Sequence, residues 1–179
     1  VIQGCGLTQE RRYAFTNDDL CGNTSAQTIA SFIIVDTTDP EIDPSAMDMT
    51  VECDGVGNDE ELQVWLDGMA MAVGSDACSD EALVWEYDLV MDEDSCGMTG
   101  VQVFRFTVTD NCGNISASNG TFTIEDTTPP TITGGEDYTG ECDQSGANND
   151  AEFLSWLTNN AGATAEDMCG TLVWSNDYH

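Results

Sequence analysis

The stretch VQVFRFTVTDNCGN at residues 101–114 decides the fold expected for this chain. Its first ten residues alternate between two faces, one of which carries Gln102, Phe104, Phe106 and Val108. Alternation with a period of two is typical of a half-buried β-strand. The segment DNCGN supplies turn-forming residues, and GTFTIE at 120–125 alternates again. The stretch therefore predicts a β-hairpin.

This hairpin sequence has an earlier counterpart in the chain. CGLTQERRYAFTNDDLCGN (5–23) aligns with CGMTGVQVFRFTVTDNCGN (96–114) at a shift of 91 positions. FIIVDTTDPEI (32–42) matches FTIEDTTPPTI (122–132), and NDEELQVWL (58–66) matches NDAEFLSWL (149–157). Self-similarity at a fixed period is the signature of repeat proteins. We expect the end of one repeat at 1–35, a complete repeat at 36–125, and the beginning of the next at 126–179.

The complete repeat reads mainly as strands. MTVEC (49–53) and ALVWEYDLV (82–90) precede the hairpin, and one helical segment lies between them. Asn58 is expected to cap that helix with Glu61 completing a capping box. Leu62, Trp65 and Leu66 then share one face. These patterns predict an all-β fold of tandem immunoglobulin-like β-sandwich repeats, about 90 residues each, with a short inserted helix.

The charge of the chain is extreme. Its 34 acidic residues face three arginines and no lysine, which gives a formal net charge of −31. Such a field repels nucleic acids and anionic membranes, and cations are needed to offset its self-repulsion. No apolar run of membrane-spanning length occurs in the sequence. We therefore expect no nucleic-acid partner, no membrane insertion, and a role for divalent cations.

Eight cysteines predict a disulfide framework and hence an extracellular or cell-surface location. The candidates are Cys5, Cys21, Cys53, Cys78, Cys96, Cys112, Cys142 and Cys169. One set of pairings brackets the helix with Cys53–Cys78 and Cys142–Cys169, and leaves Cys96–Cys112 and Cys5–Cys21. A competing arrangement joins Cys53 to Cys112, and the sequence alone does not decide between the two.

Hard oxygen ligands recur at matching positions in both copies. In a sandwich whose first and last strands run to opposite ends, the final hairpin turn lies beside the incoming linker. The expected ligands are Asp36, Asp39 and Glu41 of the linker, Asp110, Asn111 and Asn114 of the turn, and the counterparts Asp126, Asp18 and Asp19. Ca²⁺ takes six to eight such oxygens, so we expect Ca²⁺ to stiffen the junction between repeats.

The phrase TDNCGN, followed by a strand and DTTPP, resembles the HYR and related Ig-like repeats of very large secreted and cell-surface proteins from Bacteroidota-type bacteria. The resemblance extends through ECDG and the WL helix and covers essentially the whole chain. It implies a β-sandwich, extracellular placement, and use as a stalk, adhesin or matrix. The DTT phrase also resembles an O-glycan acceptor pattern of these bacteria, which makes Thr37 and Thr127 glycan candidates.

These patterns favour a structural function over catalysis. The chain has no GxSxG or HExxH motif, and nearly every recurring acid occurs once per repeat, as a joint requires. We expect a non-enzymatic structural repeat of an extracellular filament, stalk or adhesin, rigidified by calcium and disulfides. The alternative is a carbohydrate-binding or adhesive module that stacks surface glycans on Trp65, Trp85, Trp156 or Trp174.

The positions of the first and last residues within the repeat predict the binding partner of the chain. Val1 matches the phase of Asp92, and His179 matches that of Val90, so the last residue leads into the first. The strands of 1–35 and the elements of 126–179 then each need a complement. We expect the chain to associate with itself head-to-tail along a fibre, either as a continuous chain or by strand complementation between subunits.

Overall fold

A computed structural model describes residues 1–79, 83–142 and 149–177 of the chain. The end-to-end phase of His179 lies outside this part. The described residues form mainly β-strands with few helices, so the predicted all-β class is confirmed at that level. Two compact units are present: unit 1 contains Val1–Met49, Leu62–Asp92 and Gln102–Phe122, and unit 2 contains Thr50–Glu61, Glu93–Val101 and Thr123–His179. The expected repeat boundaries remain a prediction.

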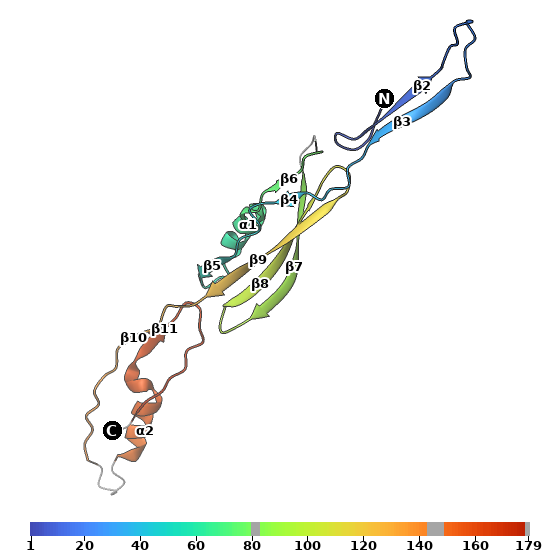
Figure 1. Cartoon of the computed structure of the whole chain (residues 1–179). Helices are drawn as coiled ribbons and strands as arrows, with labels where there is room; N and C mark the ends of the chain where they lie inside the picture. The colour runs from blue at the N-terminus through green and yellow to red at the C-terminus, as the bar shows by residue number, and fades with distance from the viewer. Residues whose placement is uncertain (80–82, 143–148, 178–179) are drawn as a thin grey trace. The chain divides into compact units, whose positions relative to one another are not determined.

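The first strands form a three-stranded sheet in the order β1-β2-β3, of which Figure 1 labels β2 and β3. The strands are β1 (Ile2–Gln3), β2 (Gln9–Phe15) and β3 (Thr28–Ile34). Tyr13 pairs with Ala30 and Arg11 with Phe32 in an antiparallel register. Paired residues share a face, so Tyr13 and Phe32 lie on the same side of the sheet. Both side chains are more than half exposed, which leaves an apolar face open to solvent.

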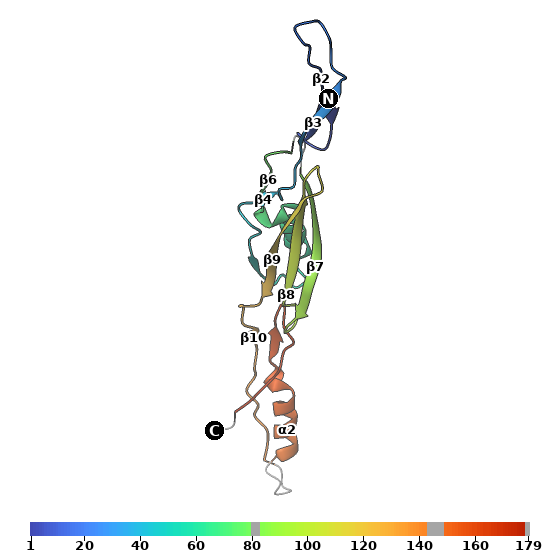
Figure 2. The ribbon, with the colours of Figure 1, turned by 45° about the vertical axis from the view of Figure 1, so that its right-hand side comes forward.

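A four-stranded sheet follows, in the order β5-β9-β8-β7. Its strands are β5 (Met49–Glu52), β7 (Val84–Asp94), β8 (Gly100–Thr109) and β9 (Ile115–Glu125). Figure 2 shows β7, β8 and β9 side by side. The predicted hairpin is confirmed as β8 and β9, joined by the turn at 110–114. The alternation along β8 predicts that Phe106 and Val108 share its buried face, and both side chains are fully buried in the structure.

Helix α1 (Asp59–Asp67) supplies the cover for this buried face. The Trp65 ring lies edge-on to Phe106 with centroids 5.4 Å apart, and 5.7 Å from Phe122. Its indole N–H donates to the Met47 carbonyl at 3.0 Å, so the buried polar atom is satisfied. Burial of each such aromatic side chain contributes about 1.5–3 kcal/mol. A Cβ at Gly120 would lie 2.9 Å from the Trp65 ring, so β9 needs glycine there.

The predicted helix is confirmed, but Asn58 does not make the expected capping box. Its side chain accepts a hydrogen bond from the Asp54 N–H at 3.2 Å and donates to the Glu52 carbonyl at 3.0 Å. Asp54 in turn accepts from the N–H groups of residues 56, 57 and 58. Asn58 is therefore a buried link between β5 and the loop before α1, with a left-handed φ of 55°.

The corresponding segment near the other end contains β10 (Thr131–Thr133), α2 (Asp150–Thr158) and β11 (Thr164–Glu166). β10 pairs with β11, and the indole of Trp156 donates to the Glu136 carbonyl at 2.8 Å. This bond parallels the one made by Trp65. Helix α2 has no fully buried residue, whereas Trp65 and Leu66 are buried in α1.

The short connecting elements are β4 (Glu41–Ile42), η1 (Met69–Met71), β6 (Gly74–Ser75) and η2 (Asn160–Gly162). β4 and β6 form a separate two-stranded sheet. The sheets of the described residues do not close on one another. The four-stranded sheet is thus faced by helix α1 and the short β4–β6 ribbon rather than by a second sheet of equal size. The Trp65 side chain of α1 fills the space that a second sheet would occupy.

Candidate metal site and disulfide-bonded contacts

Three carboxylates meet within unit 1. Asp36 lies in the linker between β3 and β4, Asp76 directly follows β6, and Asp110 begins the turn after β8. Each offers one oxygen, and these oxygens lie within 4.8 Å of one another. Segments separated by 34 or more positions in the sequence thus converge at this acidic cluster of Asp36, Asp76 and Asp110.

Asp110 is positioned by its own turn. One carboxylate oxygen accepts from the N–H groups of Cys112 at 2.8 Å and Asn114 at 2.9 Å, and the other accepts from the Asn114 side chain at 2.7 Å. Burial raises the pKa of Asp110, but the hydrogen bonds from Asn114, Cys112 and Gly113 together lower it by more, so the net shift of the pKa is downward. Asp110 is therefore a buried, ionised carboxylate near neutral pH.

Asp36 and Asp76 are held in the same way, by short backbone turns. Asp36 accepts from the Thr38 N–H at 3.1 Å, and Asp76 from the Cys78 N–H at 2.8 Å. The negative charge of the cluster also acts on the nearby thiol of Cys78. Burial raises the pKa of Cys78, and the charges of Asp36, Asp76 and Asp110 raise it further. The cluster is a local concentration of negative charge.

A cleft of about 390 Å³ opens beside two of these carboxylates. Its lining includes Asp36 and Asp76, and also the predicted ligands Asp39 and Glu41. Oxygen donors of this kind fit Ca²⁺, which is a hard cation with flexible coordination. The residues present therefore match the chemistry of a divalent cation, with Asp36, Asp76 and Asp110 as the central donors.

Asp76 was missing from the predicted ligand set. The sequence carried a signal for it, because Asp76 recurs as Asp167. Of the other predicted ligands in the turn, Asn111 accepts from the Ser79 hydroxyl at 2.8 Å, and Asn114 supports Asp110. These two amides position the turn in the structure.

The earlier turn repeats the geometry of Asp110. Asp19 accepts from the N–H groups of Cys21 at 2.9 Å and Asn23 at 2.8 Å. Hydrogen bonds from Asn23, first through its side chain and then its backbone, lower the pKa of Asp19. Asp18 forms an isolated bridge with Thr24. The structure places neither acid in the cluster around Asp110.

The predicted ligand Asp126, the counterpart of Asp36, has an acidic neighbour of its own. Asp126 accepts from the Thr128 N–H at 3.1 Å, as Asp36 does from Thr38. A Cβ built on Gly170 would lie 3.1 Å from an Asp167 oxygen and 3.9 Å from an Asp126 oxygen. The counterparts of Asp36 and Asp76 thus both lie beside Gly170 in unit 2.

The disulfides differ from both expected arrangements. Among the described residues, Cys5 is bonded to Cys112 and Cys53 to Cys169, across 107 and 116 positions. The predicted Cys53–Cys78, Cys142–Cys169, Cys96–Cys112 and Cys5–Cys21 bridges are therefore wrong, as is the competing Cys53–Cys112 bridge. Local bracketing failed because each cysteine meets a segment more than one hundred positions away.

The surroundings of the two disulfides contain the same backbone contact. The Leu7 N–H donates to the Cys78 carbonyl at 2.8 Å, and the Met98 N–H donates to the Cys169 carbonyl at 3.1 Å. The donors correspond at a shift of 91 positions, and so do the acceptors. One contact lies in unit 1 and the other in unit 2. A single contact geometry therefore occurs twice.

A glycine and a threonine shape this contact in each case. Gly6 and Gly97 have left-handed φ values of 52° and 62°, and a Cβ on either would overlap the partner carbonyl. The hydroxyl of Thr8 donates to the Cys5 carbonyl at 2.6 Å, and that of Thr99 to the Cys96 carbonyl at 2.7 Å. Glycine allows the close approach and the threonine holds the loop.

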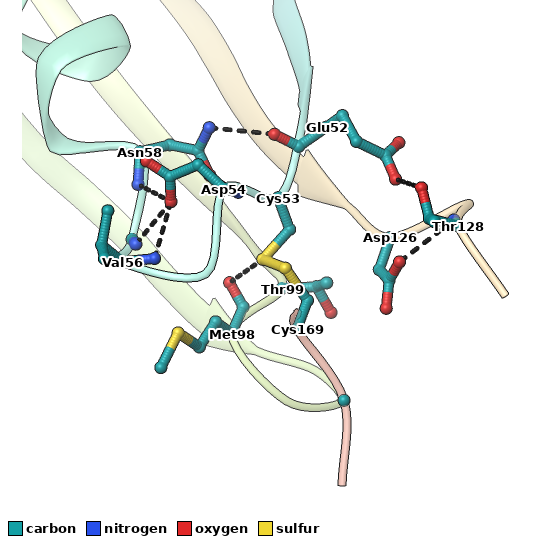
Figure 3. The surroundings of a disulfide bond; sticks show 12 residues. Glu52, Cys53, Asp54, Val56, Asn58, Met98, Thr99, Asp126, Thr128 and Cys169 are labelled. Carbon is teal, nitrogen blue, oxygen red and sulfur yellow. Dashed lines mark hydrogen bonds between the residues drawn. A yellow bond between two sulfur atoms is a disulfide. The ribbon is translucent and has the colours of Figure 1, made fainter. Parts of the chain in front are cut away.

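Figure 3 shows the Cys53–Cys169 bond with the carboxylate of Glu52 nearby. Glu52 accepts from the N–H and hydroxyl of Thr127 and from the hydroxyl of Thr128, each at 2.9 Å. These hydrogen bonds, led by the backbone N–H of Thr127, lower the pKa of Glu52. The hydroxyl of the glycan candidate Thr127 is thus engaged, whereas Thr37 is exposed.

Comparison of the sequence with protein-family models gives no match, and comparison with curated proteins gives none either. Among the described residues, no helix is both long and apolar enough to cross a membrane. The disulfides fit a non-reducing setting, because cytosolic proteins keep their thiols reduced.

Proposed function

We propose that this chain is a structural repeat of an extracellular filament, stalk or adhesin. In this proposal the chain consists of tandem immunoglobulin-like repeats that are rigidified by calcium and by disulfides. The observation that carries the proposal is the contact of Leu7 with Cys78, which recurs between Met98 and Cys169. A joint that is built twice with the same donors and acceptors is what a periodic assembly requires.

Under the expected boundaries of 1–35, 36–125 and 126–179, both disulfides join consecutive repeats. Cys5 belongs to the first and Cys112 to the second, whereas Cys53 belongs to the second and Cys169 to the third. A bond between repeats transmits tension along the array, whereas a bond inside one repeat stabilises that repeat alone. This connectivity supports a role in resisting mechanical tension.

The acidic cluster supports a second, reversible fastening at the same joints. Asp36 lies in the linker that opens the complete repeat 36–125, and Asp76 and Asp110 belong to the same repeat. Three carboxylates at this separation repel one another, and a bound Ca²⁺ replaces that repulsion with attraction. Calcium would therefore stiffen the linker and protect the joint.

The open apolar faces support association of the chain with itself. Phe106 and Phe122 are 0% and 1% exposed under Trp65, whereas the matching Phe15 and Phe32 are 55% and 61% exposed. Conversely, α2 carries no fully buried residue. The packing of α1 on β8 and β9 supports the proposal that the β2–β3 sheet takes a helix like α2 from a second copy, head-to-tail.

The carbohydrate-binding alternative requires aromatic side chains that are free to stack on sugars. Trp65 instead packs among Phe104, Phe106 and Phe122, and Trp85 lies against Gly74. These contacts favour a core role for the tryptophans of the complete repeat.

Electron microscopy of the full chain, purified under oxidising conditions with Ca²⁺, tests the filament. We expect unbranched fibres, and a compact 19.2 kDa monomer at high concentration would overturn the proposal. Phe32→Asp should abolish fibres, because it places a charge on the face that α2 of a second copy covers. Ile33→Asp is the matched control, since Ile33 is similarly exposed at 59% but lies on the opposite face.

A further inference from the structure

Two exposed thiols are the repeat counterparts of two cysteines that are bonded to each other. Cys21 and Cys96 are both free and exposed. Cys96 aligns with Cys5, and Cys21 aligns with Cys112, each at a shift of 91 positions. Because Cys5 and Cys112 are bonded to each other, the free pair consists of the counterparts of a bonded pair.

The surroundings of Cys96 match those of Cys5. Each is followed by a glycine of positive φ, Gly97 or Gly6, which allows close approach to a backbone carbonyl. Three positions after each cysteine, a buried threonine donates its hydroxyl to the cysteine carbonyl. Cys96 is therefore presented by a loop with the shape that presents Cys5 to its partner.

The turn around Cys21 likewise matches the turn around Cys112. The N–H of Cys21 donates to Asp19 at 2.9 Å, and that of Cys112 donates to Asp110 at 2.8 Å. The following glycines, Gly22 and Gly113, have φ values of 91° and 90°. The pattern Asp-x-Cys-Gly-Asn occurs at 19–23 and 110–114 in this sequence, and the second occurrence is already bonded to Cys5.

We propose that Cys96 forms a disulfide with Cys21 of a second copy of this chain, which seals the joint between subunits covalently. This inference rests on the proposed function, because the head-to-tail contact brings the two loops together. The β2–β3 sheet that carries the Cys21 turn is the element whose apolar face is open, so its docking on a second copy delivers that turn to the Cys96 loop.

The same correspondence applies to Cys78. Cys78 aligns with Cys169, which is bonded to Cys53. Cys78 would accordingly bridge a cysteine at the Cys53 position of the preceding repeat. Each joint would then hold two disulfides of the kinds seen in Cys5–Cys112 and Cys53–Cys169.

The chemistry requires an oxidant, which we take to be a small-molecule disulfide such as oxidised glutathione. The Cys96 thiolate attacks one sulfur of that disulfide and releases one thiolate, which leaves a mixed disulfide on Cys96. The thiolate of Cys21 then attacks the Cys96 sulfur and releases the second small thiolate. The two protein thiols lose two protons and two electrons, and the small disulfide is reduced to two thiols.

Isotope mixing tests whether the bond joins separate copies. Full chains, one pool labelled with ¹⁵N and one unlabelled, are mixed in the reduced state with Ca²⁺ and then oxidised with oxidised glutathione. After alkylation and digestion at acidic residues, we expect a peptide pair linking Cys21 to Cys96 that contains one heavy and one light partner. Linked pairs of uniform isotope only would mean an intramolecular bond and would overturn the proposal.

Two serine variants define the outcome further. Cys96→Ser should lose the linked peptide and leave Cys21 fully alkylated, and Cys21→Ser should do the reverse. Ser95→Ala, which changes the neighbouring exposed residue and keeps every cysteine, should retain the link. Fibres whose Cys21 and Cys96 remain alkylatable would overturn the bridge and leave the proposed filament standing. A chain that stays monomeric would overturn both.

Discussion

Cys53 is bonded to Cys169, although 116 positions separate them in the sequence. Cys53 follows β5, and Cys169 follows β11, so the bond closes a loop that contains most of the chain. In the chain-entropy account, closing a loop of this length removes about 4.7 kcal/mol of unfolded-state entropy at room temperature. The Cys5–Cys112 bond acts over a similar length. Each disulfide therefore restricts the unfolded chain by tying together segments more than one hundred positions apart.

The first prediction concerns Gly97. Gly97→Ala should lower the free energy of unfolding by more than about 1 kcal/mol, because its φ is left-handed and the new Cβ would overlap the Cys169 carbonyl oxygen. Urea denaturation measures the loss. Gly113→Ala is the matched control, since Gly113 has a left-handed φ with no neighbouring atom within 4 Å. Equal losses in both variants would show that the carbonyl contact contributes nothing.

The second prediction concerns calcium. Removal of Ca²⁺ with EDTA should lower the melting temperature, since a site filled at one hundred times its dissociation constant adds about 2.7 kcal/mol. Asp76→Asn should weaken the binding measured by calorimetry, because it removes one charge of the acidic cluster. Asp88→Asn removes an exposed charge from β7 and should leave the affinity nearly unchanged. Identical melting curves with and without EDTA would argue against the site.

The third prediction uses the thiol of Cys78. Its pKa is raised by burial and by the negative cluster, so less thiolate is present at neutral pH. Alkylation of the reduced chain should therefore be slower at Cys78 than at the exposed Cys21. Adding Ca²⁺ should speed alkylation of Cys78, because the cation offsets the carboxylate charges. Site-resolved mass spectrometry over a range of pH values gives both rates, and a Cys78 rate that does not respond to Ca²⁺ would contradict binding at this cluster.

The fourth prediction concerns Glu52 and acid. Its folded-state pKa is lowered by hydrogen bonds from Thr127 and Thr128. The stabilisation is therefore present above the ordinary pKa of glutamate and is lost as the pH falls through the lowered folded-state value. Glu52→Gln should flatten the acid dependence of unfolding in that range. Glu141→Gln, at the matching position of the second copy, serves as the control, and an unchanged acid profile in the Glu52 variant would disprove the contribution.

Local pattern was enough to predict the secondary structure around the core. The alternation of Phe104, Phe106 and Val108 predicts β8 and its buried face, and the spacing of Trp65 and Leu66 predicts α1 and the side it buries. Period and burial are properties of neighbouring residues, so they are written in the sequence. The capping of α1 was predicted wrongly, because Asn58 bonds to Glu52 and Asp54 instead.

Tertiary structure alone decided which distant groups meet. The sequence by itself determined the recurring hairpin, the helix, the acidic charge and the cysteine positions, including the match between Asp76 and Asp167. It did not determine that Cys5 meets Cys112 or that Asp76 joins Asp36 and Asp110. The physical reason is that a disulfide or a carboxylate cluster depends on how separate segments pack, and many pairings are compatible with the same local periodicity.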